Sequence, residues 1–170
     1  MMIREGTRAD AESVAALHAE SWRSAYAGIM PEEFLNGPLD EERLGTWRRR
    51  LGGDASSDRL FVAEEAGALL GFVYLVPGSD GRVLLDNLHV RPGAKRSGIG
   101  ARLLRRGLDW AAAAYPDRPV YLQVLRANVP AINFYERQGG IRTAEGLARF
   151  EQGFDLPELE YTWPPAVGSS

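Results

Sequence analysis

The sequence contains no cysteine and only two histidines, His18 and His89. The lack of cysteine excludes disulfide bonds, thiolate zinc sites, iron–sulfur clusters and a cysteine nucleophile. The scarcity of histidine argues against a histidine-rich metal site. The chain is therefore expected to work without a bound metal.

An excess of positive charge is also missing, and so is a long apolar run. Lys and Arg total 20 against 23 Asp and Glu, a formal net charge of −3. Nucleic acid phosphates need a basic surface, so nucleic acid is not expected as a partner. The longest nearly continuous apolar run, residues 68–76, is far short of the roughly 20 residues that span a bilayer. The first residues carry charge early and lack the apolar core of an export signal. We expect a cytoplasmic protein with no membrane partner.

The 170 residues fit one domain, and 45% hydrophobic with 25% charged residues is typical of a globular chain. We expect a single domain over residues 1–163. Residues 164–170, which begin with two prolines and end in Gly-Ser-Ser, are expected to form a flexible tail.

Hydrophobic periodicity and turn signals predict an alternating order of elements. Helices are expected after caps at Asp10 and Asp40, and a short helix after Pro31. The remaining elements, in chain order, are strands 2–5, 60–65, 69–76 and 83–90, a helix 98–114, a strand 120–125, a helix 128–138, and strands 141–150 and 156–163. This order predicts an α+β fold, with strands 83–90 and 120–125 parallel because a helix connects them.

The strand over residues 83–90 has an irregular pattern. Asp86 falls on the parity of the apolar Leu84 and Leu88, so polar groups appear in the middle of the strand. A β-bulge near Asp86 and Asn87 would explain this and would free backbone groups at residues 88–90 for a ligand. Polar side chains that simply face solvent also fit the pattern.

A glycine-rich turn follows this strand, in the segment Lys95-Arg96-Ser97-Gly98-Ile99-Gly100-Ala101. Two glycines let backbone N–H groups approach an anion at the start of a helix. Leu103 stands where a dinucleotide fingerprint needs a small residue, and no Gly-Lys-Ser/Thr follows as in a P-loop. The segment therefore indicates a pyrophosphate cradle of another kind, although a solvated glycine turn also fits.

Two segments resemble motifs of the GCN5-related N-acetyltransferase (GNAT) family. The family's acyl-CoA motif reads Arg or Gln, two residues, Gly, one residue, then Gly or Ala, and Gly98 and Gly100 match it. The second motif, an Asn, Ala, aromatic-Tyr, Gly pattern, is matched by Asn128, Ala131, Phe134, Tyr135 and Gly139. Residues 18–35 are also similar, so the resemblance spans most of the chain.

The sequence departs from the family pattern at three places. Lys95 stands at the leading position of the acyl-CoA motif, next to Arg96. Gly140 replaces the customary phenylalanine of the second motif, which removes an apolar anchor. Many relatives carry a glutamate on the strand before the cradle, where this chain has Leu84 and Leu85.

The resemblance implies a three-layer fold: a mixed sheet of six or seven strands, two splayed central parallel strands and helices on both faces. It also implies that acetyl-CoA is the cosubstrate, with its pantetheine arm in the cleft between those strands. The implied contacts are the backbone of Leu88, His89 and Val90 for the arm, residues 95–101 for the pyrophosphate, and Asn128, Ala131, Phe134 and Tyr135 from the second motif. Asn128 also fits a helix N-cap.

Two residues are expected to carry the chemistry. Tyr135 is the candidate acid that protonates the leaving thiolate, because a phenol can donate to it; a core aromatic is the other interpretation. An ammonium must lose a proton before it attacks, and Asp86 is the candidate base, with Glu33 and His89 as weaker candidates. Direct attack of the amine is expected, since no cysteine exists to form an acyl-enzyme.

Trp22, Tyr26 and Glu33 are expected to bind the acceptor, a small-molecule primary amine, because aromatic and acidic groups suit a cation. Ordinary helix packing and solvation also fit these residues. Two other functions remain open: acetylation of a protein N-terminus or lysine, and an inactive acyl-CoA-binding sensor. A homodimer is possible, since dimers are common among the family's members.

Overall fold

The computed structural model describes residues 1–53, 57–95 and 97–165. Most of the predicted tail, residues 166–170, lies outside the described residues, as does Arg96. The elements in chain order are β1 (Met2–Glu5), η1 (Arg8–Asp10), α1 (Ala11–Ala25), α2 (Glu32–Leu35), α3 (Leu39–Leu51), β2 (Arg59–Glu65), β3 (Ala68–Pro77), β4 (Val83–Val90), η2 (Pro92–Ala94), α4 (Ile99–Ala114), β5 (Val120–Leu125), α5 (Val129–Arg137), β6 (Ile141–Arg149) and β7 (Asp155–Trp163).

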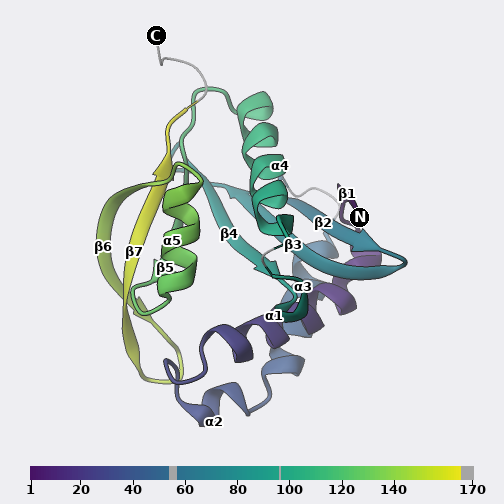
Figure 1. The fold of residues 1–170 in the computed structure, drawn as a ribbon, viewed down its shortest axis with the longest axis vertical. Coiled ribbons are helices and arrows are strands. Elements are labelled where there is room, and N and C mark those ends of the chain that lie inside the picture. The colour runs from purple at the N-terminus through teal and green to yellow at the C-terminus, as the bar shows by residue number, and fades with distance from the viewer. Residues whose placement is uncertain (54–56, 96, 166–170) are drawn as a thin grey trace.

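The strands of the described residues form one seven-stranded sheet in the order β1-β2-β3-β4-β5-β7-β6 (Figure 1). All neighbouring strands are antiparallel except β4 and β5, which are parallel. The α4 helix makes the connection between these two strands, as a parallel pair requires. The α+β fold with a mixed sheet is confirmed.

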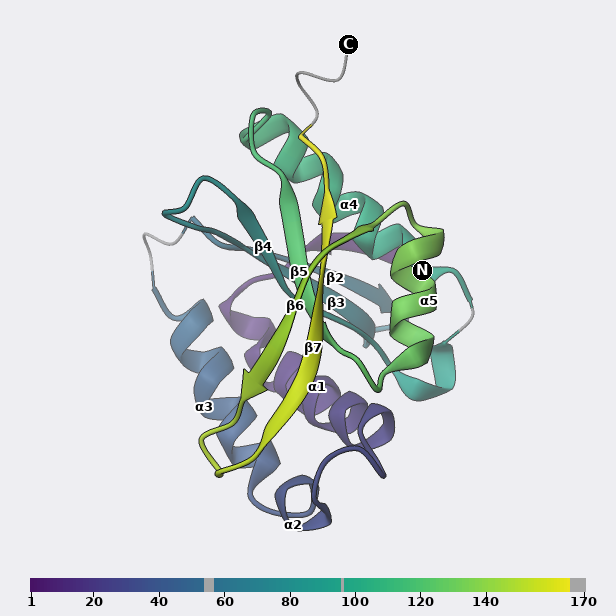
Figure 2. The ribbon, with the colours of Figure 1, turned by 90° about the vertical axis from the view of Figure 1, so that its left-hand side faces the viewer.

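Helices cover both faces of the sheet (Figure 2). Phe61 and Ala63 of β2 pack in the cluster that contains α4 and α5 residues, while Leu60 and Val62 pack in the cluster with α1 and α3. Alternate residues of a strand point to opposite faces, so this alternation places the two helix pairs on opposite sides. The apolar pattern of the strands thus builds the three layers.

A third apolar cluster lies at one end of the molecule. It joins the end of α1 and the short α2 to the tip of the β6–β7 hairpin, which meet at the bottom of Figure 1. Its members are Met30, Leu35 and Leu125, with Trp22, Tyr26, Ile29, Phe34, Ala148, Phe150, Phe154 and Leu156 packed against them. We call this group the hairpin cluster.

The two predicted helix caps have different outcomes. Asp10 occupies the N-cap position of α1, as predicted, but its side chain makes no capping hydrogen bond to that helix. Its carboxylate accepts the Thr7 N–H at 2.8 Å and pairs with Arg4 at 2.8 Å, and so closes the preceding 3₁₀ turn. The prediction for Asp40 is wrong: α3 begins at Leu39, and Asp40 in its first turn pairs with Arg23 at 2.8 Å. In both cases an arginine competes for the carboxylate.

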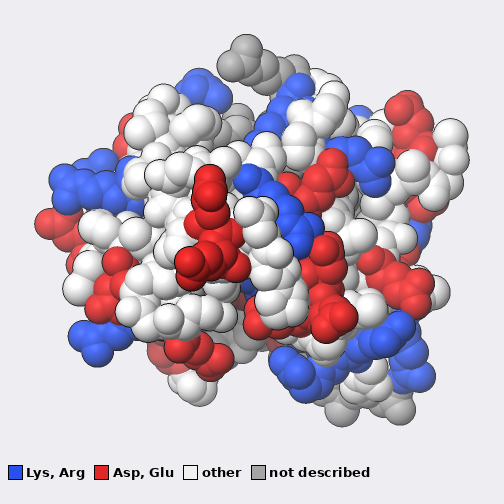
Figure 3. Space-filling model, turned by 90° about the horizontal axis from the view of Figure 1, so that it is seen from below, with Lys and Arg blue, Asp and Glu red and all other residues white. Residues whose placement is uncertain are grey.

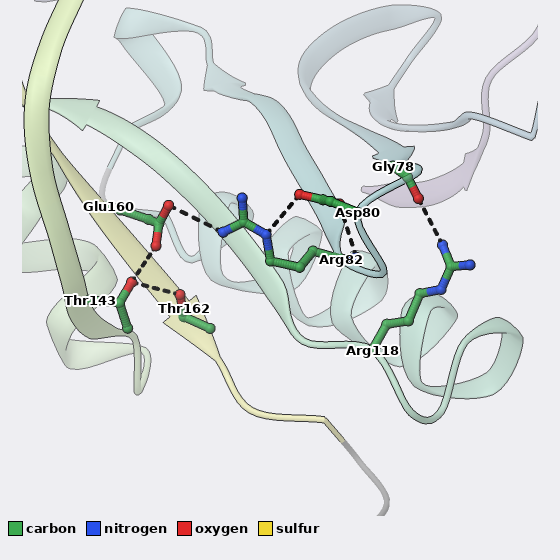
Figure 4. A network of polar contacts seen from close by, with 7 residues as sticks. All are labelled: Gly78, Asp80, Arg82, Arg118, Thr143, Glu160 and Thr162. Carbon is green, nitrogen blue, oxygen red and sulfur yellow. Dashed lines mark hydrogen bonds and ion pairs between the residues drawn. The ribbon is translucent and has the colours of Figure 1, made fainter.

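A polar network fastens one end of the β4–β5 pair (Figure 4). Arg82, just before β4, donates to Asp80 at 2.9 Å and to Glu160 of β7 at 3.2 Å. Its guanidinium carbon lies 3.6 Å from the centroid of the Tyr121 ring on β5. Because Arg82 contacts both β5 and β7, it holds β4 against them at this end.

On the lower face of the molecule, acidic and basic side chains are interspersed (Figure 3). None of the helices in the described residues is long and apolar enough to cross a membrane.

Candidate active site

The parallel strands β4 and β5 separate soon after they begin. Only Val83 and Leu84 pair with β5, opposite Val120 and Tyr121, although both strands continue for several residues. A cleft of about 1170 Å³ lies at this divergence. It is lined by parts of α1, β4, β5 and α5, by the turn before α4, and by Ala148, Phe150 and Glu158 from the end of the sheet.

The predicted β-bulge is present in β4. Leu85 pairs with Leu75 and Asn87 with Tyr74, so Asp86 is an extra residue opposite two consecutive residues of β3. Both Asp86 and Asn87 line the cleft. Beyond the bulge, Leu88, His89 and Val90 pair with β3 on one side and also line the cleft. The edge of β4 that faces β5 has no strand ladder there, which leaves backbone groups for a ligand.

The glycine-rich turn places a helix N-terminus at the cleft. Gly98 adopts a left-handed conformation with φ of +83°, which glycine accepts without strain, and the helix has no side-chain cap. The first N–H with an intrahelical partner is that of Arg102, which donates to the Gly98 carbonyl at 3.1 Å. The N–H groups of Ile99, Gly100 and Ala101 precede it and are available to an anion.

The neighbouring residues of the cradle take different positions. Ser97 Oγ donates to the Ala94 carbonyl and so closes the turn before α4. Lys95 lines the cleft, whereas the side chain of Ile99 is buried in the core. The prediction for Arg96 lies outside the described residues.

The two glycines predict a matched pair of variants. Gly98→Ala places a side chain at positive φ, which costs about 1–2 kcal/mol and shifts the turn, so the Kd for acetyl-CoA should rise roughly tenfold. At Gly100, an added Cβ would lie 3.5 Å from Phe134, an ordinary contact. Gly100→Ala should therefore change the Kd by no more than about twofold. Isothermal titration of both variants checks this, and equal losses would contradict it.

The α5 helix begins at the cleft. Asn128 caps it, since Oδ1 accepts the Ala131 N–H at 3.4 Å, and Asn128 also lines the cleft. Asn128 can therefore act as the helix N-cap and still contact a ligand in the cleft. Ala131 and Phe134 line the same cleft, and the Phe134 ring lies beside Gly100. The second motif therefore lies against the glycine turn, as its resemblance to the family implied.

Tyr135 lies on α5 and is both a core residue and a cleft residue. Its ring packs edge-on against Phe134 and Trp163, with centroids 5.4 and 6.1 Å apart. Burial is the main cause that raises the pKa of Tyr135, and the nearby Tyr26 hydroxyl raises it further. A phenol with a raised pKa stays protonated at neutral pH, as a proton donor must.

The missing phenylalanine at Gly140 has a substitute in the structure. A Cβ at Gly140 would lie 2.9 Å from Cζ2 of Trp163, so the β7 indole occupies the space next to the glycine. Trp163 Nε1 donates to the Gln138 carbonyl at 3.1 Å and so holds the end of α5. The apolar anchor that the motif lacks is therefore supplied by another strand.

Asp86 lines the cleft, as predicted, but its carboxylate is already paired. Arg50 of α3 lies 2.9 Å from Oδ2, and Asn87 Nδ2 donates to the same oxygen at 2.9 Å. The Arg50 guanidinium also stacks on Trp47 and Tyr74, with its central carbon 5.0 and 5.2 Å from the ring centroids. The charge of Asp86 is thus balanced by a fixed cation.

His89, a weaker candidate base, belongs to a buried aromatic and polar cluster. Its Nδ1 lies 2.9 Å from Ser21 Oγ, and its ring centroid lies 4.7 Å from that of His18. Burial, with the positive charges of Arg43 and Lys95, lowers the pKa of His89 to about 3. Burial also lowers the pKa of His18, whose Nδ1 accepts the Trp47 Nε1–H at 3.0 Å. Both rings are neutral at pH 7.

The predicted acceptor residues are only partly brought together. Trp22 and Tyr26 line the cleft, with their ring centroids 5.2 Å apart. Glu33 is exposed on α2, and the structure does not bring it to the cleft lining. Glu158 of β7 lines the cleft and was missed by the sequence analysis. In the sequence, Glu158 is marked only as a polar residue of the last strand. No local pattern shows that this strand inserts beside β5.

Comparisons with known proteins agree with this geometry. Residues 14–140 match the model of the acetyltransferase (GNAT) family. The chain is 30% identical over 170 residues to YuaI, an uncharacterized N-acetyltransferase of Bacillus subtilis (strain 168), over 95% of this chain and 92% of that protein. It is 39% identical over 138 residues to YiaC, a peptidyl-lysine N-acetyltransferase of Escherichia coli (strain K12), over 81% and 82% of the two chains.

A solved structure shares the fold. The PaiA N-acetyltransferase of Thermoplasma acidophilum, in complex with coenzyme A, superposes with a TM-score of 0.73 over 95% of this chain and 98% of that chain, at 21% identity. The fold and the relatives define an acyltransferase enzyme. More narrowly, the chain belongs to the GNAT family of N-acetyltransferases, which confirms the resemblance of the two motifs.

Proposed function

We propose that this protein transfers the acetyl group of acetyl-CoA to the primary amine of a small molecule. The observation that carries the proposal is the hairpin cluster, whose aromatic and apolar side chains join α1, α2 and the β6–β7 tip across one end of the cleft. The members of this cluster that line the cleft are Trp22, Tyr26, Met30, Leu125, Ala148 and Phe150. An apolar wall of this kind suits a small acceptor, whereas a peptide needs an open channel.

The residues present fit acetyl-CoA as the cosubstrate. The uncapped start of α4 offers backbone N–H groups to the pyrophosphate, and Lys95 adds positive charge. The unpaired edge of β4 over residues 88–90 suits the amides of the pantetheine arm, which then lie as an added strand. Asn128, Ala131 and Phe134 line the other side of the same cleft.

The proposed chemistry is direct attack by the amine in a ternary complex. Tyr135 donates its phenolic proton to the departing thiolate, a role supported by its place in the cleft. Asp86, the base expected from the sequence, is paired with Arg50 and Asn87, which leaves its carboxylate less free to bind and deprotonate a cation.

Peptidyl-lysine acetylation is the second candidate, favoured by the 39% identity to YiaC. A single screen separates the two functions and the inactive sensor. The purified protein is incubated with acetyl-CoA and either a panel of amine metabolites or lysine-containing peptides, and free CoA is followed. We expect turnover with small amines. Turnover with peptides alone would favour the second candidate, and tight acetyl-CoA binding without any turnover would favour a sensor.

A further inference from the structure

The strand β7 presents two different faces near the cleft. Leu159 and Tyr161 are buried in the core beneath α4 and α5, whereas Leu156 belongs to the hairpin cluster on the α1 side. Glu158 shares the parity of Leu156, so its side chain points to the α1 side. It lies directly opposite Leu125 of β5, another member of the hairpin cluster.

Glu158 differs from the other acidic residues near the cleft. Asp86 is paired with Arg50, and Glu160, two residues along the same face of β7, is held by Arg82 and by Thr143 at 2.7 Å (Figure 4). Glu158 has no hydrogen-bond or ion-pair partner among the described residues. Partial burial of a carboxylate without a cation partner costs free energy. Such a carboxylate is therefore suited to bind a cationic group of a ligand.

The surroundings of Glu158 are apolar and aromatic. Tyr26, Met30 and Phe150 line the same cleft and belong to the hairpin cluster with Leu125. The Trp22 ring lies nearby in the cluster, with the Arg43 guanidinium 4.2 Å from its centroid. Burial in this environment raises the pKa of Glu158, and a raised pKa makes a carboxylate a better proton acceptor near neutral pH.

We propose that Glu158 binds the ammonium group of the acceptor and accepts its proton, and that the acceptor is a monocationic primary amine carrying an apolar or aromatic group. The inference rests on the proposed function and names the acceptor class for it. The cleft offers one carboxylate without a cation partner among the described residues, within an apolar wall. A polyamine would leave its further charges unpaired there.

The proton and bond changes balance. The ammonium gives one proton to the Glu158 carboxylate, and the nitrogen lone pair forms a bond to the acetyl carbonyl carbon. The carbon–sulfur bond then breaks, and the thiolate takes the Tyr135 proton. The nitrogen of the new amide loses its second proton to solvent, and a proton from solvent restores the Tyr135 phenol. The products are the acetamide and coenzyme A, with one proton released from Glu158.

Several other titratable groups face this region. The acidic and phenolic groups are Glu160 on β7, held by Arg82, Asp86 on β4, held by Arg50, and Tyr26 and Tyr135, whose pKa values are raised by burial. The cations are Lys95 before α4 and Arg137 on α5, which line the cleft, and Arg43 on α3, which lies over Trp22. His89 stays neutral because its pKa is about 3. On β5, Gln123 and Leu125 carry no charge, and on β6 the residue opposite Glu158 is Gly146.

The test compares Glu158→Gln with the wild type in steady-state kinetics from pH 5.5 to 9, with a phenylalkylamine and spermidine as probes. The wild type should prefer the phenylalkylamine and show a kcat/KM that rises with pH as Glu158 ionises. In Glu158→Gln, kcat/KM at pH 7 should fall by tens-fold, roughly 2 kcal/mol, with a raised KM for the amine and loss of the rising limb. The Kd for acetyl-CoA should stay unchanged.

One control variant and one competing variant sharpen the test. The control, Glu160→Gln, removes a carboxylate on the same face of the same strand, away from the cleft lining, and should keep the pH profile. The competing variant, Asp86→Asn, removes the base expected from the sequence, and the inference assigns the rising limb to Glu158 instead. Any of three results would overturn the inference. The pH dependence of kcat/KM is unchanged in Glu158→Gln, its rising limb is lost in Asp86→Asn instead, or the wild type prefers spermidine.

The failure of the proposed function has a different signature. If the wild type acetylates only peptides, the proposed small-molecule function is wrong. The kinetics of Glu158→Gln and the wild type are then compared with the peptide as acceptor. Unchanged kinetics would overturn the role of Glu158. If the wild type acetylates neither class, both proposals fall together.

Discussion

Replacing Tyr135 with phenylalanine should lower kcat by about 10²–10³-fold, because the departing thiolate loses its proton donor. The ring stays in place between Phe134 and Trp163, so the packing of α5 should be preserved. The Kd for acetyl-CoA, measured by titration calorimetry, should change by less than about twofold. The loss should therefore appear in kcat and not in binding.

Tyr121→Phe is the matched control for this experiment. Tyr121 is another partly buried tyrosine, on β5 beneath Arg82 and away from the cleft lining. Its loss of a hydroxyl should leave kcat unchanged. Equal kcat values for Tyr135→Phe and the wild type would remove Tyr135 from the chemistry and leave it a core aromatic.

Replacing Trp163 with alanine should lower the free energy of unfolding by about 3–5 kcal/mol, the usual cost of emptying a buried tryptophan site. The indole is only 7% exposed, fills the space beside Gly140 and donates to the Gln138 carbonyl. Urea unfolding measures the loss, and the thermal midpoint should fall by roughly 6–20 °C. Because Trp163 also contacts Tyr135, turnover should fall as well.

Trp110→Ala provides the comparison. Trp110 on α4 is only partly buried and packs at the edge of the core against Tyr115. Its loss should cost about 1–2 kcal/mol, in line with the smaller apolar area it buries. Similar losses at both positions would contradict the view that Trp163 replaces the anchor missing at Gly140.

The elements that the sequence predicted well are those with strong local signals. The parity break at Asp86 predicted the bulge, and the strand–helix–strand order predicted the parallel pair β4–β5. The Gly98 turn was also predictable, since its place between a strand and a helix requires a flexible backbone. The bulge and the turn depend on neighbours within a few residues, and the parallel pair depends only on the order of consecutive elements.

Most features that escaped prediction depend on residues far apart in the chain. Arg23 takes the carboxylate of Asp40, 17 residues away, which local rules assigned to a helix cap. Arg4 takes that of Asp10 from six residues away, just outside the range of the cap rules. Glu158 reaches the cleft because β7 inserts between β5 and β6. Glu33 does not reach it, because it lies on the exposed face of α2. Register and topology settle such positions, and a single sequence carries little information on either.

The short β4–β5 pairing has a consequence for how the protein responds to its cosubstrate. The sheet has two halves, one formed by strands β1–β4 and the other by β5, β7 and β6. Among the described residues, the two halves pair only where Val83 and Leu84 meet β5. An extended molecule in the gap would bridge the two halves along their open edges and couple their motions. Among residues 85–90 of β4, the amides whose N–H groups point to the gap and not to β3 would exchange more slowly on binding, and so would report occupancy of the gap.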